Sequence, residues 1–199
     1  DFVHAIFQKI TDINRLSLTR FLELTGPYLQ VVKMGDDLGS QQNALISPTA
    51  YRRMIKPYHQ ELFRLIKQYS RARVFLHTCG AVYKLIPDLI DAGVEILNPV
   101  QVSAANMDTR RLKAEFGDHL TFWGAIDTQH VLPHGSAEEV EIEVRRRIDD
   151  LATDGGYVLA PVHNIQADVP AENIIAMYRS ARKFGRYPLS LLPNRDMNR

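Results

Sequence analysis

The sequence repeats one pattern, in which a short apolar segment ends in polar or turn residues and an amphipathic helix follows. The apolar segments predict strands over 28–34, 73–76, 94–97, 120–123 and 157–160. Short strands that are apolar throughout are typical of a sheet covered on both faces, and helices between consecutive strands make those strands parallel. The repeat therefore predicts an α/β fold in which helices cover a parallel sheet.

The connecting helices are predicted from apolar residues spaced three and four apart and from end signals. Ser47 is expected to cap a long helix that Pro57 kinks, and Gly93 is expected to end another helix. Ser136 is expected to cap a further helix that has acidic residues in its first turn. The predicted helices cover residues 2–24, 48–66, 82–92, 108–116, 136–152 and 170–184.

Polar or turn residues follow every predicted strand, at 36–37, 77–80, 98–101, 124–127 and 161–164. A (β/α)8 barrel builds its site from the loops at the C-terminal ends of its strands, so this distribution favours a barrel. A dinucleotide-binding sheet should carry a glycine-rich fingerprint after one strand, and the sequence has none. Because about five βα units are recognisable where a barrel needs eight, we expect the C-terminal portion of a (β/α)8 TIM barrel. An open five-stranded α/β sheet is the alternative.

The amino-acid composition limits which partners and which cellular compartment are expected for the chain. Lys and Arg number 24 against 23 Asp and Glu, and this balance argues against electrostatic binding of nucleic acid or an anionic membrane. No apolar run approaches the roughly 20 residues of a membrane span, and the single cysteine, Cys79, fits a reducing compartment. We expect a cytoplasmic protein whose residues 1–199 form one partial barrel domain, completed by an N-terminal barrel half that this chain lacks.

The strongest local signal for chemistry is the pair His77 and Cys79. Residues two apart on a strand project to the same face, so the imidazole and the thiol are expected to point together at the C-terminal end of the strand. Nitrogen and sulfur ligands suit Zn²⁺. The alternative is a buried cysteine that acts as a small apolar residue beside a hydrogen-bonded histidine.

His163 is the predicted third metal ligand, because it follows the last strand at the same end of the predicted barrel. Three protein ligands leave one coordination position open, as in catalytic zinc sites. The alternative for His163 is a hydrogen bond to a ligand residue or to substrate. The remaining histidines are expected to be solvated: His4, His59, His119, His130 and His134.

Further polar residues at strand ends are candidates for binding a small-molecule substrate. Asp36 and Asp37 are adjacent and must alternate sides, so only one can face the barrel interior, and we favour Asp37 as a substrate-binding group or base. Gln101 is expected to orient substrate, or else to hydrogen-bond loop backbone. Asp127 has two alternatives as well: it binds substrate or acts as a base, or its side chain caps the following turn.

The sequence resembles the uroporphyrinogen decarboxylase superfamily, which includes the decarboxylase, corrinoid-dependent methyltransferases and cobalamin-independent methionine synthase. The resemblance follows the expected order along nearly the whole chain and implies a (β/α)8 barrel. The matching segments are MGDDLGSQ (34–41), LISPTAYRRMIKPYHQEL (45–62), FLHTCG (75–80), GVEILNPVQVSAANMD (93–108), FWGAIDTQ (122–129) and GGYVLAPVHNIQADVPAENI (155–174).

The resemblance implies two activities. The methyltransferase branch is similar in its H-x-C pair, which implies that His77 and Cys79 bind zinc and that a corrinoid on a partner protein supplies the methyl group to a thiol. The later ligand of that branch is commonly a cysteine, whereas this sequence has His163. The decarboxylase branch uses no metal and has a substrate-contacting histidine near His163. We expect a zinc-dependent methyltransferase, with cofactor-free uroporphyrinogen decarboxylation as the alternative.

Overall fold

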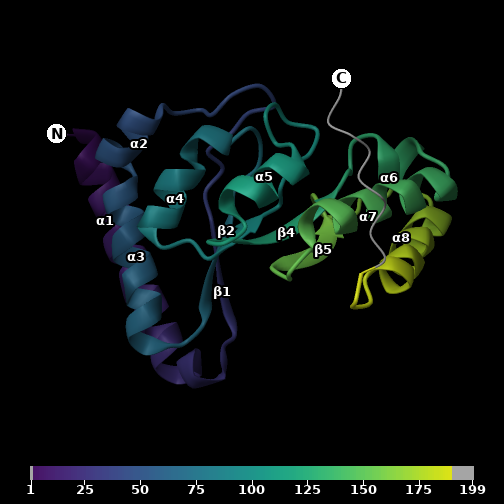
Figure 1. Cartoon of the computed structure of the whole chain (residues 1–199). Coiled ribbons are helices and arrows are strands. Elements are labelled where there is room, and N and C mark those ends of the chain that lie inside the picture. The colour runs from purple at the N-terminus through teal and green to yellow at the C-terminus, as the bar shows by residue number, and fades with distance from the viewer. Residues whose placement is uncertain (1, 190–199) are drawn as a thin grey trace. The chain divides into compact units, whose positions relative to one another are not determined.

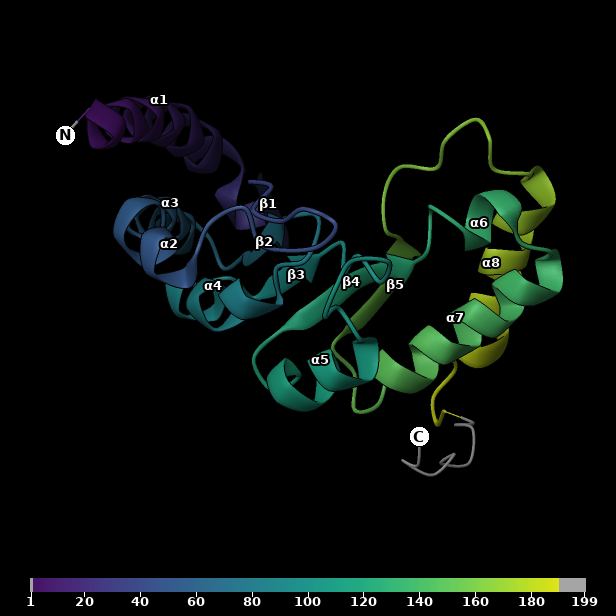
Figure 2. The same cartoon turned by 90° about the horizontal axis from the view of Figure 1, so that it is seen from above.

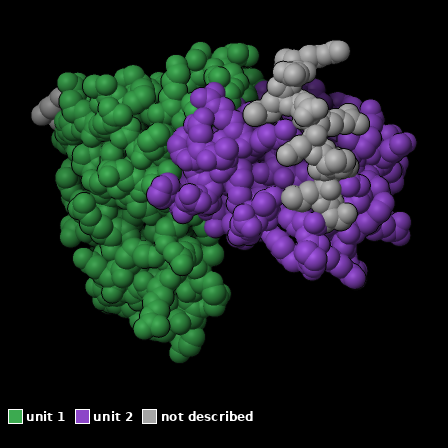
Figure 3. All heavy atoms as spheres, in the orientation of Figure 1, with its two compact units in different colours: residues 1–98, 104–106 green, residues 99–103, 107–199 purple. Residues whose placement is uncertain are grey.

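The computed structural model describes residues 2–189, which divide into two compact units (Figures 1 and 3). The first unit holds the residues up to Asn98 together with 104–106, and the second holds 99–103 and the residues from Met107 onward. The expectation of one barrel domain over residues 1–199 stays a prediction.

The first unit consists of helices around three short parallel strands. Its elements are α1 (Phe2–Thr25), η1 (Gly26–Tyr28), β1 (Val31–Gly35), α2 (Pro48–Met54), α3 (Lys56–Tyr69), β2 (Arg73–His77), η2 (Tyr83–Leu85), α4 (Ile86–Ala92) and β3 (Ile96–Asn98). β2 pairs in parallel with both β1 and β3, and His77 is in register with Gly35 on one side and Asn98 on the other. The C-terminal ends of the three strands therefore lie at one edge, where polar side chains follow them.

Local signals explain the helix boundaries of this unit. The side chain of Ser47 accepts a hydrogen bond from the Ala50 N–H at 3.2 Å and so caps α2. The helix is interrupted at Ile55, and Pro57 stands in the first turn of α3. This interruption confirms the predicted kink. Gly93 ends α4 at a φ of 112°, a left-handed conformation that favours glycine.

The second unit contains a parallel strand pair and a packed pair of long helices. Its elements are α5 (Thr109–Phe116), β4 (Thr121–Ile126), α6 (Val131–His134), α7 (Ala137–Leu151), β5 (Tyr157–Pro161) and α8 (Ala171–Phe184). β4 and β5 are parallel, and α7 lies beside α8 (Figure 2). Apolar side chains of α6, α7 and α8 enclose a core that includes Leu132, Val144 and Met177.

A buried charge network links α5 to α7 in the second unit. Arg147, whose side chain is 8% exposed, donates two hydrogen bonds to the carboxylate of Glu143, at 2.9 and 3.1 Å. It also donates to the hydroxyl of Thr109 at 2.7 Å, and that hydroxyl donates to Asp150 at 2.6 Å. Charges removed from water require such partners, so the network holds the two helices in one arrangement.

Parallel strands alternating with helices confirm the α/β prediction and the architecture of a partial (β/α) barrel. Several boundaries differ from expectation. The strands expected from Tyr28 and Val94 begin at Val31 and Ile96, and β4 runs on through Ile126. The short helix α6 was not predicted, and the helix expected over 82–92 is divided into η2 and α4 after Leu85. Among residues 2–189, no helix combines the length and the apolar character that crossing a bilayer requires.

Candidate metal centre

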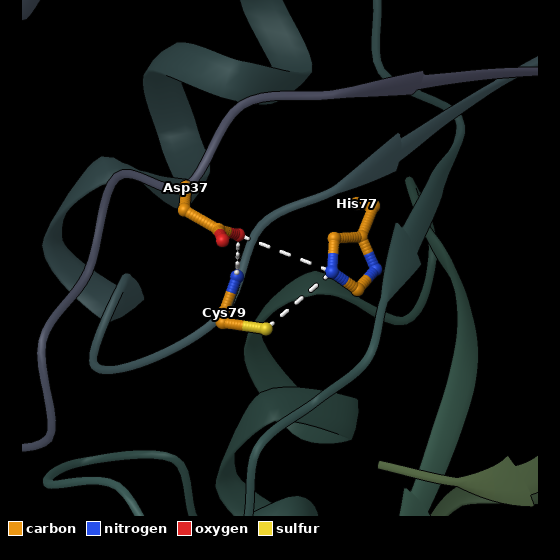
Figure 4. A group of neighbouring side chains, drawn as sticks. All are labelled: Asp37, His77 and Cys79. Carbon is orange, nitrogen blue, oxygen red and sulfur yellow. Dashed lines mark hydrogen bonds and ion pairs between the residues drawn. The ribbon is translucent and has the colours of Figure 1, made fainter. Parts of the chain in front are cut away.

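Asp37, His77 and Cys79 come together at the C-terminal edge of the strands in the first unit (Figure 4). One possible ligand atom from each residue lies within 4.8 Å of the other two. His77 Nε2 is 3.4 Å from the Cys79 sulfur and 3.9 Å from Asp37 Oδ1. The predicted convergence of His77 and Cys79 is therefore present, and Asp37 joins them.

The strand register places and orients the imidazole of His77. Asn98 is its neighbour across β2 and β3, and Asn98 Oδ1 lies 2.6 Å from His77 Nδ1. An amide oxygen only accepts hydrogen bonds, so Nδ1 carries the proton and Nε2 keeps its lone pair toward Cys79 and Asp37. Histidine ligands of metal ions are held in this way by a hydrogen bond to the second ring nitrogen.

Backbone hydrogen bonds fix the loop that carries Asp37. Asp37 Oδ1 accepts from the Cys79 N–H at 2.9 Å, and the buried hydroxyl of Thr78 accepts from the Leu38 N–H at 3.1 Å. The loops after β1 and β2 then run in direct backbone contact, because the Ala81 N–H donates to the Ser40 carbonyl at 2.8 Å. The carboxylate therefore reaches the cluster through two loops that are hydrogen-bonded to each other.

Glycines at two positions permit this close approach. A Cβ at Gly39 would lie 2.6 Å from the Cys79 carbonyl oxygen, closer than side-chain atoms come to backbone. Gly80 has a φ of 87°, and a Cβ there would lie 2.6 Å from both the Gly39 and the Ser40 carbonyl oxygens. The two loops can pack against each other only while both positions lack a side chain.

The electrostatics of the cluster favour a cation. Burial raises the pKa of the Cys79 thiol above its usual value, and the negative charge and hydrogen bond of Asp37 raise it further. A thiol held protonated beside a carboxylate is a poor nucleophile by itself. A metal ion between the two groups reverses this effect, since it stabilises the thiolate and neutralises the carboxylate.

The donor set fits Zn²⁺, as does the spacing of the His77 nitrogen and the Cys79 sulfur, whereas the Asp37 oxygen lies farther from His77 than in a tetrahedral site. Zinc accepts imidazole nitrogen, thiolate sulfur and carboxylate oxygen, and a tetrahedral site separates sulfur from nitrogen by about 3.6 Å and nitrogen from oxygen by about 3.4 Å. The corresponding separations are 3.4 and 3.9 Å. A zinc ion held by these three residues would keep a fourth position for an exchangeable molecule, as catalytic zinc sites do.

The structure places the other predicted site residues as follows. His163 is an exposed side chain on the loop after β5, and Gln101 is a half-buried residue of the loop after β3. Both belong to the second unit, so their parts in binding metal and substrate stay predictions. Asp127 Oδ1 accepts from the Gln129 and His130 N–H groups at 2.6 and 3.0 Å, which is the capping role given as its alternative.

The expectation that His59 is solvated was wrong. His59 is 9% exposed, and its two ring nitrogens lie 3.0 Å from the Tyr51 hydroxyl and 3.2 Å from Asp36 Oδ2. Asp36 and Asp37 therefore turn to different partners, as the alternation of adjacent residues predicts. The burial of His59 had a local signal, because His59 stands three and four residues before Leu62 and Phe63 on the buried face of α3.

Replacing Asn98 by alanine is expected to weaken zinc binding by about 10- to 100-fold, because His77 then loses the hydrogen bond that directs Nε2 toward the metal. Zinc competition against a chromogenic chelator measures the change. Asn173→Ala is the control, because Asn173 is also buried and donates to the Leu132 and Gly135 carbonyls in the second unit. Equal zinc affinity in the two variants would contradict the role given to Asn98.

Comparison with known proteins relates the chain to enzymes of two kinds. It is 27% identical over 169 residues to the uroporphyrinogen decarboxylase of Syntrophotalea carbinolica, an overlap that covers 84% of this chain and 45% of that protein. It is 28% identical over 148 residues to the methylcobamide:CoM methyltransferase MtaA of Methanosarcina barkeri, covering 74% of this chain and 40% of that protein.

A solved structure shares the fold. A methyltransferase from Methanosarcina mazei superimposes with a TM-score of 0.68 at 21% sequence identity, covering 88% of this chain and 48% of the other. The chain thus spans less than half the length of each of these relatives. The family model for uroporphyrinogen decarboxylase (URO-D) matches residues 1–184. The chain therefore belongs to the uroporphyrinogen decarboxylase family.

Proposed function

We propose that this chain carries the metal-binding part of a zinc-dependent methyltransferase, which transfers a methyl group from a corrinoid or methylated substrate to a thiol. The observation that carries the proposal is the convergence of Asp37, His77 and Cys79 on one point. The similarity to a methylcobamide:CoM methyltransferase supports both the reaction class and a corrinoid protein as partner.

Each residue of the cluster has a defined task in this proposal. His77 presents Nε2 as a neutral ligand because Asn98 holds the proton on Nδ1. Cys79 supplies a negatively charged sulfur, and Asp37 supplies a carboxylate oxygen or orients the acceptor. Zn²⁺ held by these residues would lower the pKa of a thiol acceptor and so favour its nucleophilic thiolate form.

Removing either strand-end ligand is expected to remove zinc. Apparent binding energies of about 10–16 kcal/mol for four-ligand sites correspond to about 3 kcal/mol for each ligand, or roughly a 100-fold loss of affinity. Full-length protein should therefore contain about one zinc per chain, and Cys79→Ser and His77→Gln should lose most of it after dialysis. His119→Gln is the control because His119 is exposed in the second unit. Unchanged zinc in Cys79→Ser would refute the proposal.

Zinc binding is expected to strengthen as the pH rises. Burial and Asp37 raise the pKa of the Cys79 thiol, so the metal-free protein binds a proton there that zinc must displace. Below that raised pKa, the logarithm of the zinc affinity should increase by about one for each pH unit because one proton is released. Titration at several pH values measures the slope. The same slope in Cys79→Ser would show that the displaced proton comes from another group.

Decarboxylation of uroporphyrinogen without a cofactor is the second candidate. The 27% identity to the decarboxylase of Syntrophotalea carbinolica favours it. The two activities are distinguished by assaying full-length protein after complete removal of metal. Turnover of uroporphyrinogen by the metal-free protein would establish decarboxylation, whereas methyl transfer that depends on added zinc would establish the first proposal.

A further inference from the structure

The first unit contains a cavity of about 440 Å³ that borders the metal cluster. α1, α3 and the end of β1 contribute to its lining, and α1 lies beside α3 in both views of the fold (Figures 1 and 2). Asp37 belongs both to this lining and to the metal cluster. A molecule held in the cavity is therefore adjacent to the proposed zinc, and the volume lies within the range of small-molecule sites.

Phe7, Tyr58 and Phe63 contribute aromatic rings to an apolar wall that is otherwise aliphatic. Phe7 and Tyr58 line the cavity with ring centroids 5.8 Å apart, and His59 stacks on Phe63 at 5.3 Å. Aromatic faces carry a negative quadrupole that attracts cations, above all alkylated ammonium groups that shed water easily. The wall is thus suited to the apolar surface of an organic cation as well as to a neutral hydrocarbon.

The charged side chains of the lining favour an organic cation over a neutral hydrocarbon. Asp36 and Asp37 both line the cavity, and none of the described lining residues is a lysine or arginine. Asp37 is a proposed zinc ligand, and bound metal would neutralise it, so Asp36 is the carboxylate that disfavours an anionic ligand and attracts a positive one. A polycarboxylate such as a porphyrinogen would meet repulsion at this wall.

A buried hydrogen-bond chain holds Asp36 in place. Asp36 Oδ2 lies 3.2 Å from His59, and the other nitrogen of His59 lies 3.0 Å from the hydroxyl of Tyr51, which is fully buried. The side chain of Asp36 remains 45% exposed, and its Oδ1 has no partner among residues 2–189. One carboxylate oxygen is therefore anchored while the other is available to a ligand.

From these observations we propose that the cavity binds a small organic ammonium ion, with its alkyl groups against Phe7, Tyr58 and Phe63 and its charge beside Asp36. That this cation is the methylated substrate of the reaction rests on the proposed function. Binding itself requires only the cavity, its rings and the carboxylate of Asp36.

The test compares two probes of the same shape. Choline carries a quaternary ammonium group, and 3,3-dimethylbutan-1-ol replaces its nitrogen by carbon and is neutral. Calorimetric titration of full-length protein is expected to show choline binding about 10-fold more tightly than the alcohol. Asp36→Asn should weaken choline binding by about 10-fold and leave the alcohol unchanged, because only the charge is removed. Asp118→Asn, which removes an exposed carboxylate from the second unit, should change neither.

Zinc content measured on the same samples separates this proposal from the metal proposal. Preferential binding of choline that depends on Asp36 supports the ammonium site whether or not zinc is present. Equal binding of choline and the alcohol, binding of neither probe, or loss of choline binding in Asp118→Asn as great as in Asp36→Asn would overturn it. A zinc-loaded protein without choline preference refutes the ammonium site alone.

Discussion

Replacing Arg147 by alanine is expected to lower the free energy of unfolding by about 3–5 kcal/mol. The substitution leaves the carboxylate of Glu143 buried, with its side chain 9% exposed, and removes the guanidinium that is bonded to both of its oxygens. Asp150 keeps a hydrogen bond from Arg110 at 3.3 Å. It also removes the hydrogen bond to Thr109, which joins α5 to α7. Urea denaturation followed by circular dichroism measures the loss.

Arg146→Ala is the matched control, since Arg146 is the preceding residue of the same helix. Its side chain is 59% exposed and its nitrogen is 3.9 Å from Asp150. Exposed ion pairs contribute about 0–1 kcal/mol, so this variant should stay close to the parent protein. If Arg147→Ala were no less stable than Arg146→Ala, the buried network would not hold α5 against α7.

Replacing Gly80 by alanine is expected to destabilise the protein by at least about 3 kcal/mol, from the left-handed backbone and from overpacking together. The methyl group would meet the backbone of Gly39 and Ser40, which belongs to the loop that carries Asp37. Because the collision is with backbone, relief requires the two loops to separate. Zinc affinity should therefore fall together with stability, as measured by denaturation and by chelator competition.

Gly155→Ala separates the cost of the left-handed backbone from the cost of overpacking. Gly155 has nearly the same backbone conformation, with a φ of 85°, but nothing lies within 4 Å of the position of its Cβ. This variant should show only the cost of the left-handed conformation, about 1–2 kcal/mol, and should keep its zinc affinity. Equal effects on zinc binding would contradict the requirement for close packing of the loops after β1 and β2.

The elements of the fold were largely predictable because their signals are local. Ser47, Pro57 and Gly93 act within one helical turn, and the structure confirms each of them. The predicted β4 is too short because glycine, here Gly124, is typical of turns. In the structure, pairing with β5 extends the strand through Ile126. Pairing between strands is a contact between distant segments, and local patterns do not encode it.

The candidate site was predictable only in part, for the same reason. The two-residue spacing predicts that His77 and Cys79 point together, and the structure brings them together although β2 ends at His77 and Cys79 stands in the following loop. The hydrogen bond from His77 to Asn98 depends on the register of β2 against β3, which no feature of either strand alone specifies. The contact of His59 with Asp36 likewise joins α3 to the loop after β1.

The zinc X-ray absorption spectrum of full-length protein loaded with one equivalent of zinc tests the metal centre most directly. The fine structure should contain one sulfur at about 2.3 Å together with nitrogen or oxygen at about 2.0–2.2 Å. The sulfur contribution should disappear in Cys79→Ser, because Cys79 is the one cysteine of residues 1–199. A spectrum with nitrogen and oxygen scatterers alone, or one that Cys79→Ser leaves unchanged, would contradict a zinc site at Asp37, His77 and Cys79.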